Sequence, residues 1–169
     1  MKPVNDMHAA IVTYFTAEKR ESLLFMAVGF VAIAASVFLW RTGSPWRGMA
    51  YPLAAIALIQ IVVGSTVYFR TDSQMLGFHT QLAADPEGYV DAELPRMEKV
   101  RRSFTVYKGI EIALLVLGAA GYFLLRDRQT LLAVSLGLMI QAALMLALDL
   151  VAEHRADVYM EHIRRLASG

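Results

Sequence analysis

The chain has 169 residues, of which 57% are hydrophobic and 18% charged, and its mean hydropathy is +0.47. A soluble domain usually carries about a quarter of charged residues, so this composition argues against one. The net charge of +1 lacks the clustered basic excess that nucleic acid requires, and no nucleic-acid partner is expected. The absence of cysteine excludes disulfides, thiol redox chemistry and cysteine-ligated metals.

The apolar residues are gathered into four blocks. In chain order they are Ser22–Trp40, Gly48–Phe69, Gly109–Leu125 and Thr130–Val151. Each is long enough to cross the roughly 30 Å hydrocarbon core of a bilayer, which takes about 17–25 helical residues. The segment before the first block is too long for a cleavable signal, and the block ends in Phe38–Arg41 without a cleavage site, so a retained span is expected. The lipid bilayer is therefore a predicted partner.

The distribution of basic residues predicts the orientation. Four of the sixteen Lys/Arg residues lie in the two short loops within the paired spans, and the other twelve lie in the N-terminal, central and C-terminal segments. The positive-inside rule places those twelve in the cytoplasm. Fourteen of the fifteen acidic residues lie on the same side, so that face is nearly neutral. We expect a multi-pass protein of a bacterial-type inner membrane with its N- and C-termini inside.

The helices are expected to continue past the membrane. One stripe with spacings of three and four runs through Glu93, Met97, Val100, Phe104, Tyr107, Glu111, Leu114 and Gly118. Similar stripes predict cytoplasmic helical extensions over residues 5–21, 70–84, 91–108 and 152–167, with a turn at Ala84–Gly88. Each helix would measure roughly 50 Å, about 20 Å more than the membrane needs. The sequence thus predicts one all-α membrane domain over residues 1–169, an up-down-up-down bundle of four transmembrane helices.

The two halves of the chain share a weak internal repeat. Val37–Arg41 parallels Gly121–Arg126, and Ala57–Gln60 parallels Leu138–Gln141. Because each copy contains two spans, the copies would share one orientation and be related by a pseudo-two-fold axis along the membrane normal. The alternative is a chance match between apolar helices of similar composition.

Ionisable residues near the cytoplasmic boundary form the candidate site. Glu111 and Asp149 each lie two residues inside a span, where a charge costs several kcal/mol and normally finds a partner in the bundle interior. The predicted ligand-binding residues are Arg70, Glu111, Asp149, Glu153, Glu18, Tyr107, Tyr159 and Arg155. They indicate either a pocket for a cation or small polar ligand, or a salt-bridge network that fixes helix register. In both cases Arg70 or Arg155 should lie within salt-bridge distance of Glu111 or Asp149.

No cofactor is expected. None of the four histidines lies in a span, which argues against haem, and we expect them to be solvated. The Glu-x-x-His motif of dimetal bundles is absent. A less regular metal site built from Glu18, Glu111, Asp149 and Glu153 stays open as an alternative. No catalytic signature is present, so no enzyme class is indicated.

Several strings resemble a group of small four-helix bacterial membrane proteins. They are Tyr68–Thr71, Pro95–Val100, Ile110–Leu114 and Ala152–Arg155. The resemblance covers most of the chain from the second span onward and implies a bacterial origin. That group has no assigned activity, so the resemblance assigns no role to any residue.

Three functions follow as hypotheses. The first is a membrane protein that binds a cation or small polar ligand, related to transport, for which four spans would need a homodimer to form a path. The second is an accessory protein whose cytoplasmic half-bundle docks a partner. The third is an intramembrane enzyme acting on a lipid. Stabilisation of the purified protein by ions would favour the first, and recovery of a stable partner in a pull-down would favour the second.

The orientation is tested with reporter fusions. Fusions at Pro86 and Gly169 should report a cytoplasmic location and a fusion at Gly43 a periplasmic one, because of the distribution of Lys and Arg. A periplasmic result at Pro86 would overturn the predicted orientation.

Overall fold

A computed structural model describes residues 2–168 as four long helices joined by short connections. The helices are α1 (Lys2–Arg41), α2 (Ala50–Ala84), α3 (Pro86–Leu124) and α4 (Gln129–Ala167), and a short 3-10 helix, η1 (Arg47–Met49), leads into α2. All four long helices are long and apolar enough to cross a membrane. The predicted all-α, four-helix membrane bundle is confirmed, and the chain is a multi-pass membrane protein.

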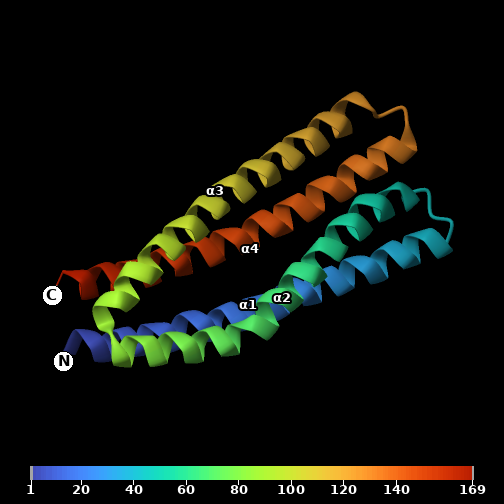
Figure 1. The fold of residues 1–169 in the computed structure, drawn as a ribbon. Helices are drawn as coiled ribbons and strands as arrows, with labels where there is room; N and C mark the ends of the chain where they lie inside the picture. The colour runs from blue at the N-terminus through green and yellow to red at the C-terminus, as the bar shows by residue number, and fades with distance from the viewer. Residues whose placement is uncertain (1, 169) are drawn as a thin grey trace.

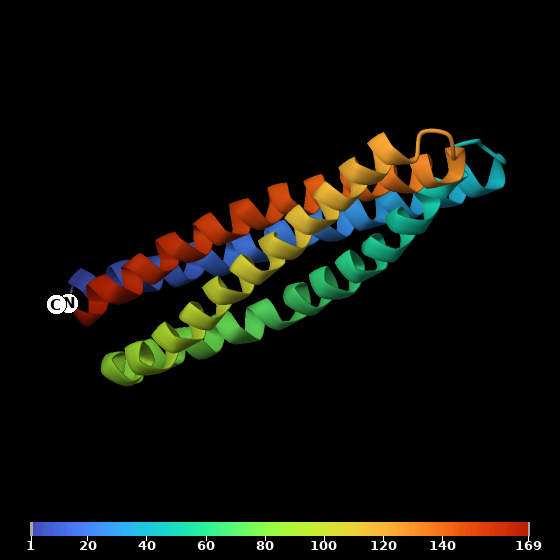
Figure 2. The same ribbon diagram turned by 90° about the horizontal axis from the view of Figure 1, so that it is seen from above.

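The helices pair into two hairpins, α1 with α2 and α3 with α4 (Figure 1). Both termini lie at one end of the bundle and the two short loops at the other, which we call the terminal end and the loop end. The hairpins meet through α4, which contacts α1, η1 and α2, and α2 approaches α3 near the terminal end (Figure 2). This pairing matches the two α-hairpins that the sequence repeat predicts.

The helices run without interruption well past the predicted spans. The prediction of nearly continuous helices over residues 92–126 and 130–166 is confirmed, although α3 ends two residues early, at Leu124. The turn between α2 and α3 is shorter than predicted, because Asp85 alone connects them. The Asp85 carboxylate accepts a hydrogen bond from the Gly88 N–H at 3.0 Å, and Pro86 supplies the first residue of α3. This combination starts a helix at once.

The terminal half of the bundle has a conventional hydrophobic core. Buried side chains from all four helices form a single cluster there, including Ile11, Phe15, Leu82, Met97 and Ile163. These residues lie outside the predicted spans, so transfer of their surface from water drives their packing. The inward stripes predicted from the sequence supply most of this core.

The loop half is held by close backbone contacts instead. A Cβ atom on Gly137 of α4 would lie 2.9 Å from the carbonyl oxygen of Met49 and 2.9 Å from Cγ of Pro52. Such contacts are typical of membrane helices, which have no hydrophobic driving force between them in lipid. Between these contacts and the terminal half, Nε2 of Gln141 donates to Oε1 of Gln60. The predicted sequence repeat makes these two residues equivalent, and a pseudo-two-fold axis would bring such a pair together.

The close approach at Gly137 predicts a difference between two glycine substitutions. Gly137→Ala should lower the free energy of unfolding by about 1–3 kcal/mol, because rigid backbone of Met49 has to move. Gly77→Ala in α2 is the matched control, since no atom lies within 4 Å of a Cβ there and alanine favours helix by about 1 kcal/mol. Denaturation in detergent measures both. Equal stabilities would show that Gly137 does not set the helix separation.

Candidate functional site

The predicted ligand-binding residues do not line one pocket. They fall into separate groups along the bundle axis: a carboxyl pair at the predicted membrane boundary, ion pairs beside it and a polar network in the core of the terminal half. A groove of about 660 Å³ between α1 and α4 is lined by Arg155 and Tyr159, but by none of the predicted acids. Helix spacing correctly predicts which residues face inward in most cases. It does not predict which neighbouring helix each one contacts, and these contacts separate the residues into groups.

Glu111 and Asp149 form the carboxyl pair. Glu111 is 2% exposed, and its carboxyl group lies within hydrogen-bonding reach of the Asp149 carboxyl on α4. Both carboxylate oxygens of Glu111 are buried, and among the described residues no side chain or backbone group donates a hydrogen bond to either. Two carboxylates this close in a poorly solvated place do not both stay charged without a neutralising partner.

The predicted arginine partners of this pair are elsewhere. Among the side chains of residues 4–168 no cation lies within 4.0 Å of either carboxylate, so the prediction for Arg70 and Arg155 is wrong. The Arg70 guanidinium lies 4.0 Å from Glu18, and its side chain is 50% exposed. The Arg155 guanidinium forms an ion pair with Glu21. Both arginines reach α1 because this helix packs against α2 and α4 and presents acids at their level.

Lys108 is the cation nearest in sequence to the carboxyl pair, and the sequence analysis missed it. Its Nζ atom donates to both oxygens of Glu153, at 2.7 and 2.6 Å. Lys108 precedes Glu111 by three residues and Glu153 follows Asp149 by four, so this ion pair forms the next layer toward the terminal end. It is partly exposed, at 26% for Lys108 and 17% for Glu153.

A second ionic layer joins α1 to α2. Nζ of Lys19 lies 2.5 Å from the carboxylate of Asp72 and 4.8 Å from the centre of the Tyr68 ring. The hydrogen bond to Asp72 raises the pKa of Lys19. The hydroxyl of Thr71 donates to Glu18 at 3.2 Å. Glu18 is therefore engaged within the first hairpin, away from the carboxyl pair on the second.

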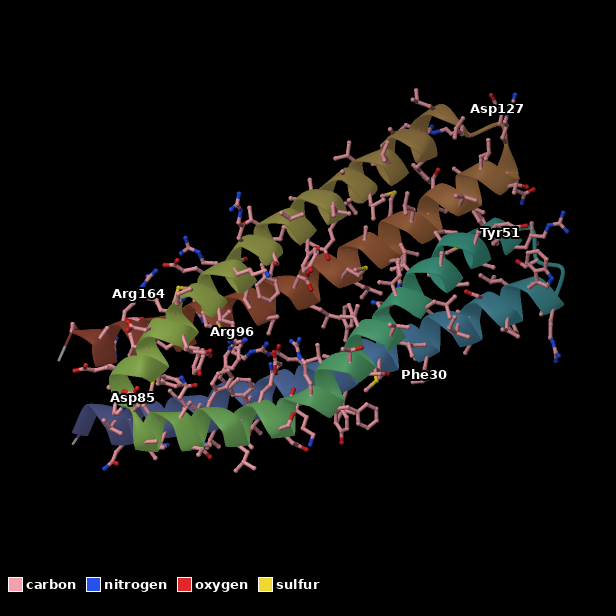
Figure 3. All side chains as sticks on the ribbon, in the orientation of Figure 1. Phe30, Tyr51, Asp85, Arg96, Asp127 and Arg164 are labelled. Carbon is pink, nitrogen blue, oxygen red and sulfur yellow. The ribbon has the colours of Figure 1, made fainter. Side chains whose placement is uncertain are left out.

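The core of the terminal half contains a buried polar network around Glu93. The Glu93 side chain is 1% exposed, and Arg96 donates two hydrogen bonds of 2.6 Å to its carboxylate. The Tyr159 hydroxyl donates to the same carboxylate at 3.1 Å and lies 2.6 Å from the Tyr89 hydroxyl. Arg96 lies between the hairpins (Figure 3), with its guanidinium 5.0 Å from the centre of the Phe78 ring. The network thus connects α2, α3 and α4.

Tyr14 and Tyr159 both belong to this core. The Tyr14 and Tyr159 rings stack with their centres 4.3 Å apart, and the Arg155 guanidinium lies 4.9 Å from the centre of the Tyr14 ring. Burial, and then the charge of Glu93, raise the pKa of Tyr159, which keeps its hydroxyl protonated as a donor. Tyr107, in contrast, is 51% exposed and does not face the interior as predicted. Lys108 takes that position instead.

Two histidines are partly buried, where the sequence predicts solvated ones. The His8 and His79 rings stack with their centres 5.0 Å apart, and their Nδ1 atoms are 2.7 Å apart. Partial burial, and then the nearby His8, lower the pKa of His79. Within the described chain no group of three or more His, Asp or Glu side chains is arranged to hold a metal ion. The irregular four-carboxylate metal site considered above is therefore not formed.

Comparison with models of known protein families, with curated proteins and with solved structures finds no match for this chain.

Alanine substitutions of Arg96 and Arg70 should have different effects on stability. Arg96→Ala would leave the buried Glu93 carboxylate without its cation and should cost about 3–5 kcal/mol of unfolding free energy. Arg70→Ala should cost less than about 1 kcal/mol, because its pair with Glu18 is long and half exposed. Denaturation of both variants in detergent provides the comparison. Similar losses for the two would mean that Glu93 does not depend on Arg96.

Proposed function

We propose that this chain is a small inner-membrane protein that binds a cation, the proton included, between Glu111 and Asp149 at the cytoplasmic boundary. One observation carries the proposal: Glu111 is buried at membrane depth against a second carboxyl group, with no protein donor for either of its oxygens. A protein side chain satisfies most buried charges in a membrane. Where none does, a bound cation or proton neutralises the pair.

The number of ligands favours a proton or a singly charged ion. Calcium takes six to eight oxygen ligands, and magnesium requires six in near-octahedral geometry. The pair supplies two carboxyl groups, and the described residues contain no larger converging set of metal ligands. Two carboxyl groups in contact suit a shared proton, as in aspartic proteases.

The Lys108–Glu153 ion pair would connect the site to the cytoplasm. It lies one helical turn closer to the terminal end than the carboxyl pair and is partly exposed. A proton or ion leaving Glu111 or Asp149 in that direction meets Glu153 first. In the opposite direction the bundle offers the uncharged Gln60–Gln141 pair, followed by close backbone contacts and apolar side chains. The site would therefore exchange with the cytoplasmic side.

The location follows from the charge distribution. Both termini and the Asp85 turn lie at the end that carries twelve of the sixteen Lys/Arg residues, and we assign this end to the cytoplasm by the positive-inside rule. A transport role would require a homodimer, because only the α3–α4 hairpin contributes to the carboxyl pair.

The alternative function, docking of a partner protein on the cytoplasmic half-bundle, has one observation in its favour. The groove of about 660 Å³ between α1 and α4 lies in that half and combines apolar walls with Arg155, His162 and Arg165. Such a surface suits a partner helix with acidic and apolar residues.

The proposed cation site predicts a loss of ligand-dependent stabilisation. Purified wild-type protein should gain thermal stability from a fall in pH or from one of Na⁺, K⁺, Mg²⁺ or Ca²⁺, by about 2.7 kcal/mol at a hundredfold excess over Kd. Glu111→Gln should fold normally and lose this dependence, because the amide removes one charge and can donate to Asp149. Melting temperatures measured across pH and in each salt at constant ionic strength test this.

Glu161→Gln is the matched control, because Glu161 is exposed and paired within α4 to Arg165. It should respond to pH and cations as the wild type does. If wild type and Glu111→Gln respond identically, the carboxyl pair binds no cation and the proposal fails.

A further inference from the structure

The loop half of the bundle contains a groove of about 890 Å³ between α1 and α4. Residues of η1 and α2 complete its floor, and apart from Gln141 its walls are aliphatic or aromatic. Val31 and Phe38 on its rim are 70% and 65% exposed, so the groove opens toward lipid. A groove of this size and polarity suits one lipid-soluble molecule.

Gln141 makes the groove more than a lipid-facing depression. The side chain is 0% exposed, lines the groove and donates to Gln60, while its own Oε1 atom has no partner among the described residues. Nε2 of Gln60 is unpartnered as well. A buried acceptor without a donor costs free energy, and lipid tails at this depth cannot supply one.

We propose that this groove binds a lipid-soluble alcohol or phenol, whose hydroxyl donates to Oε1 of Gln141 while its apolar body fills the space beside Val31 and Leu136. The proposal is independent of the carboxyl pair on α3 and α4. An acyl chain of a bilayer lipid fills the groove but leaves Gln141 unpaired, because lipid hydrogen-bonding groups lie at the interface. If the oxygen and nitrogen of both glutamine amides are exchanged, Gln141 presents an N–H donor to the groove. A hydroxyl both donates and accepts, so it can pair with Gln141 in either orientation.

Trp46 provides the readout, because it lines the groove and the chain has only two tryptophans. The second, Trp40, is 58% exposed and is replaced in a Trp40→Phe background. Two probes, para-octylphenol and octylbenzene, differ only in the hydroxyl group. Each probe is titrated into detergent-solubilised protein. Trp46 is excited at the red edge of the indole absorption band, so that the probes themselves absorb little, and its emission is recorded. Probe concentrations are expressed per mole of detergent.

The phenol should bind about fivefold or more tightly than octylbenzene, as expected for one hydrogen bond to a buried acceptor. In Gln141→Leu the two probes should bind equally. Ala27→Phe, which adds a ring to the wall of the groove and leaves Gln141 in place, should abolish the emission change with both probes.

Equal affinity of the two probes for the Trp40→Phe protein would overturn the proposal, and this comparison does not depend on whether Gln141→Leu folds. A preference for the phenol that persists in Gln141→Leu would overturn it too. A third result would also overturn it: Trp46 emission that does not change with either probe but changes with the protein-to-detergent ratio. A second copy of the chain would then occupy the groove.

Discussion

The structure depends on one constraint, which is that every helix must pack in two solvents. An unbroken helix of 35 to 40 residues is roughly 50–60 Å long, and the hydrocarbon core covers only about 30 Å of it. Because the helix is rigid across the boundary, the face that points inward in lipid continues inward in water. In water this face gains from burying Ile11, Phe15 and Met97. In lipid, burial of apolar side chains no longer stabilises the bundle, and close packing of helices, as at Gly137, stabilises it instead.

The polar groups are ordered by the same change of solvent. Exposed ion pairs such as Lys19–Asp72 lie where water is available. The Glu93 network is buried in the soluble core and has donors for its carboxylate from Arg96 and Tyr159. Glu111, at the predicted membrane boundary, is a buried acid whose two oxygens have no donor among the described residues. The two acids therefore differ: Glu93 is neutralised by the protein, and Glu111 is the residue that could bind an exchangeable cation.

The sequence predicted the fold well because helical periodicity and span length depend on local composition. The spacing of three and four residues placed Glu93, Met97 and Glu111 on one buried face of α3. The same spacing was ambiguous one turn away, since Tyr107 and Lys108 lie four and three residues before Glu111. Only the presence of Glu153 on the facing helix decides between them. The predicted contact of Arg70 with the carboxyl pair was wrong for a related reason. Periodicity gives the level of a residue along the bundle axis, but tertiary packing decides which helix it contacts.

The connection between the hairpins has a mechanical consequence. Asp85 alone joins α2 to α3 at the terminal end. At the loop end the hairpins meet a second time, because Gly48 and Gly137 bring the backbone of η1 close to α4. Two attachments roughly 50 Å apart prevent one hairpin from swinging about either end. Relative movement is therefore limited to bending or twisting of the helices between the two attachments.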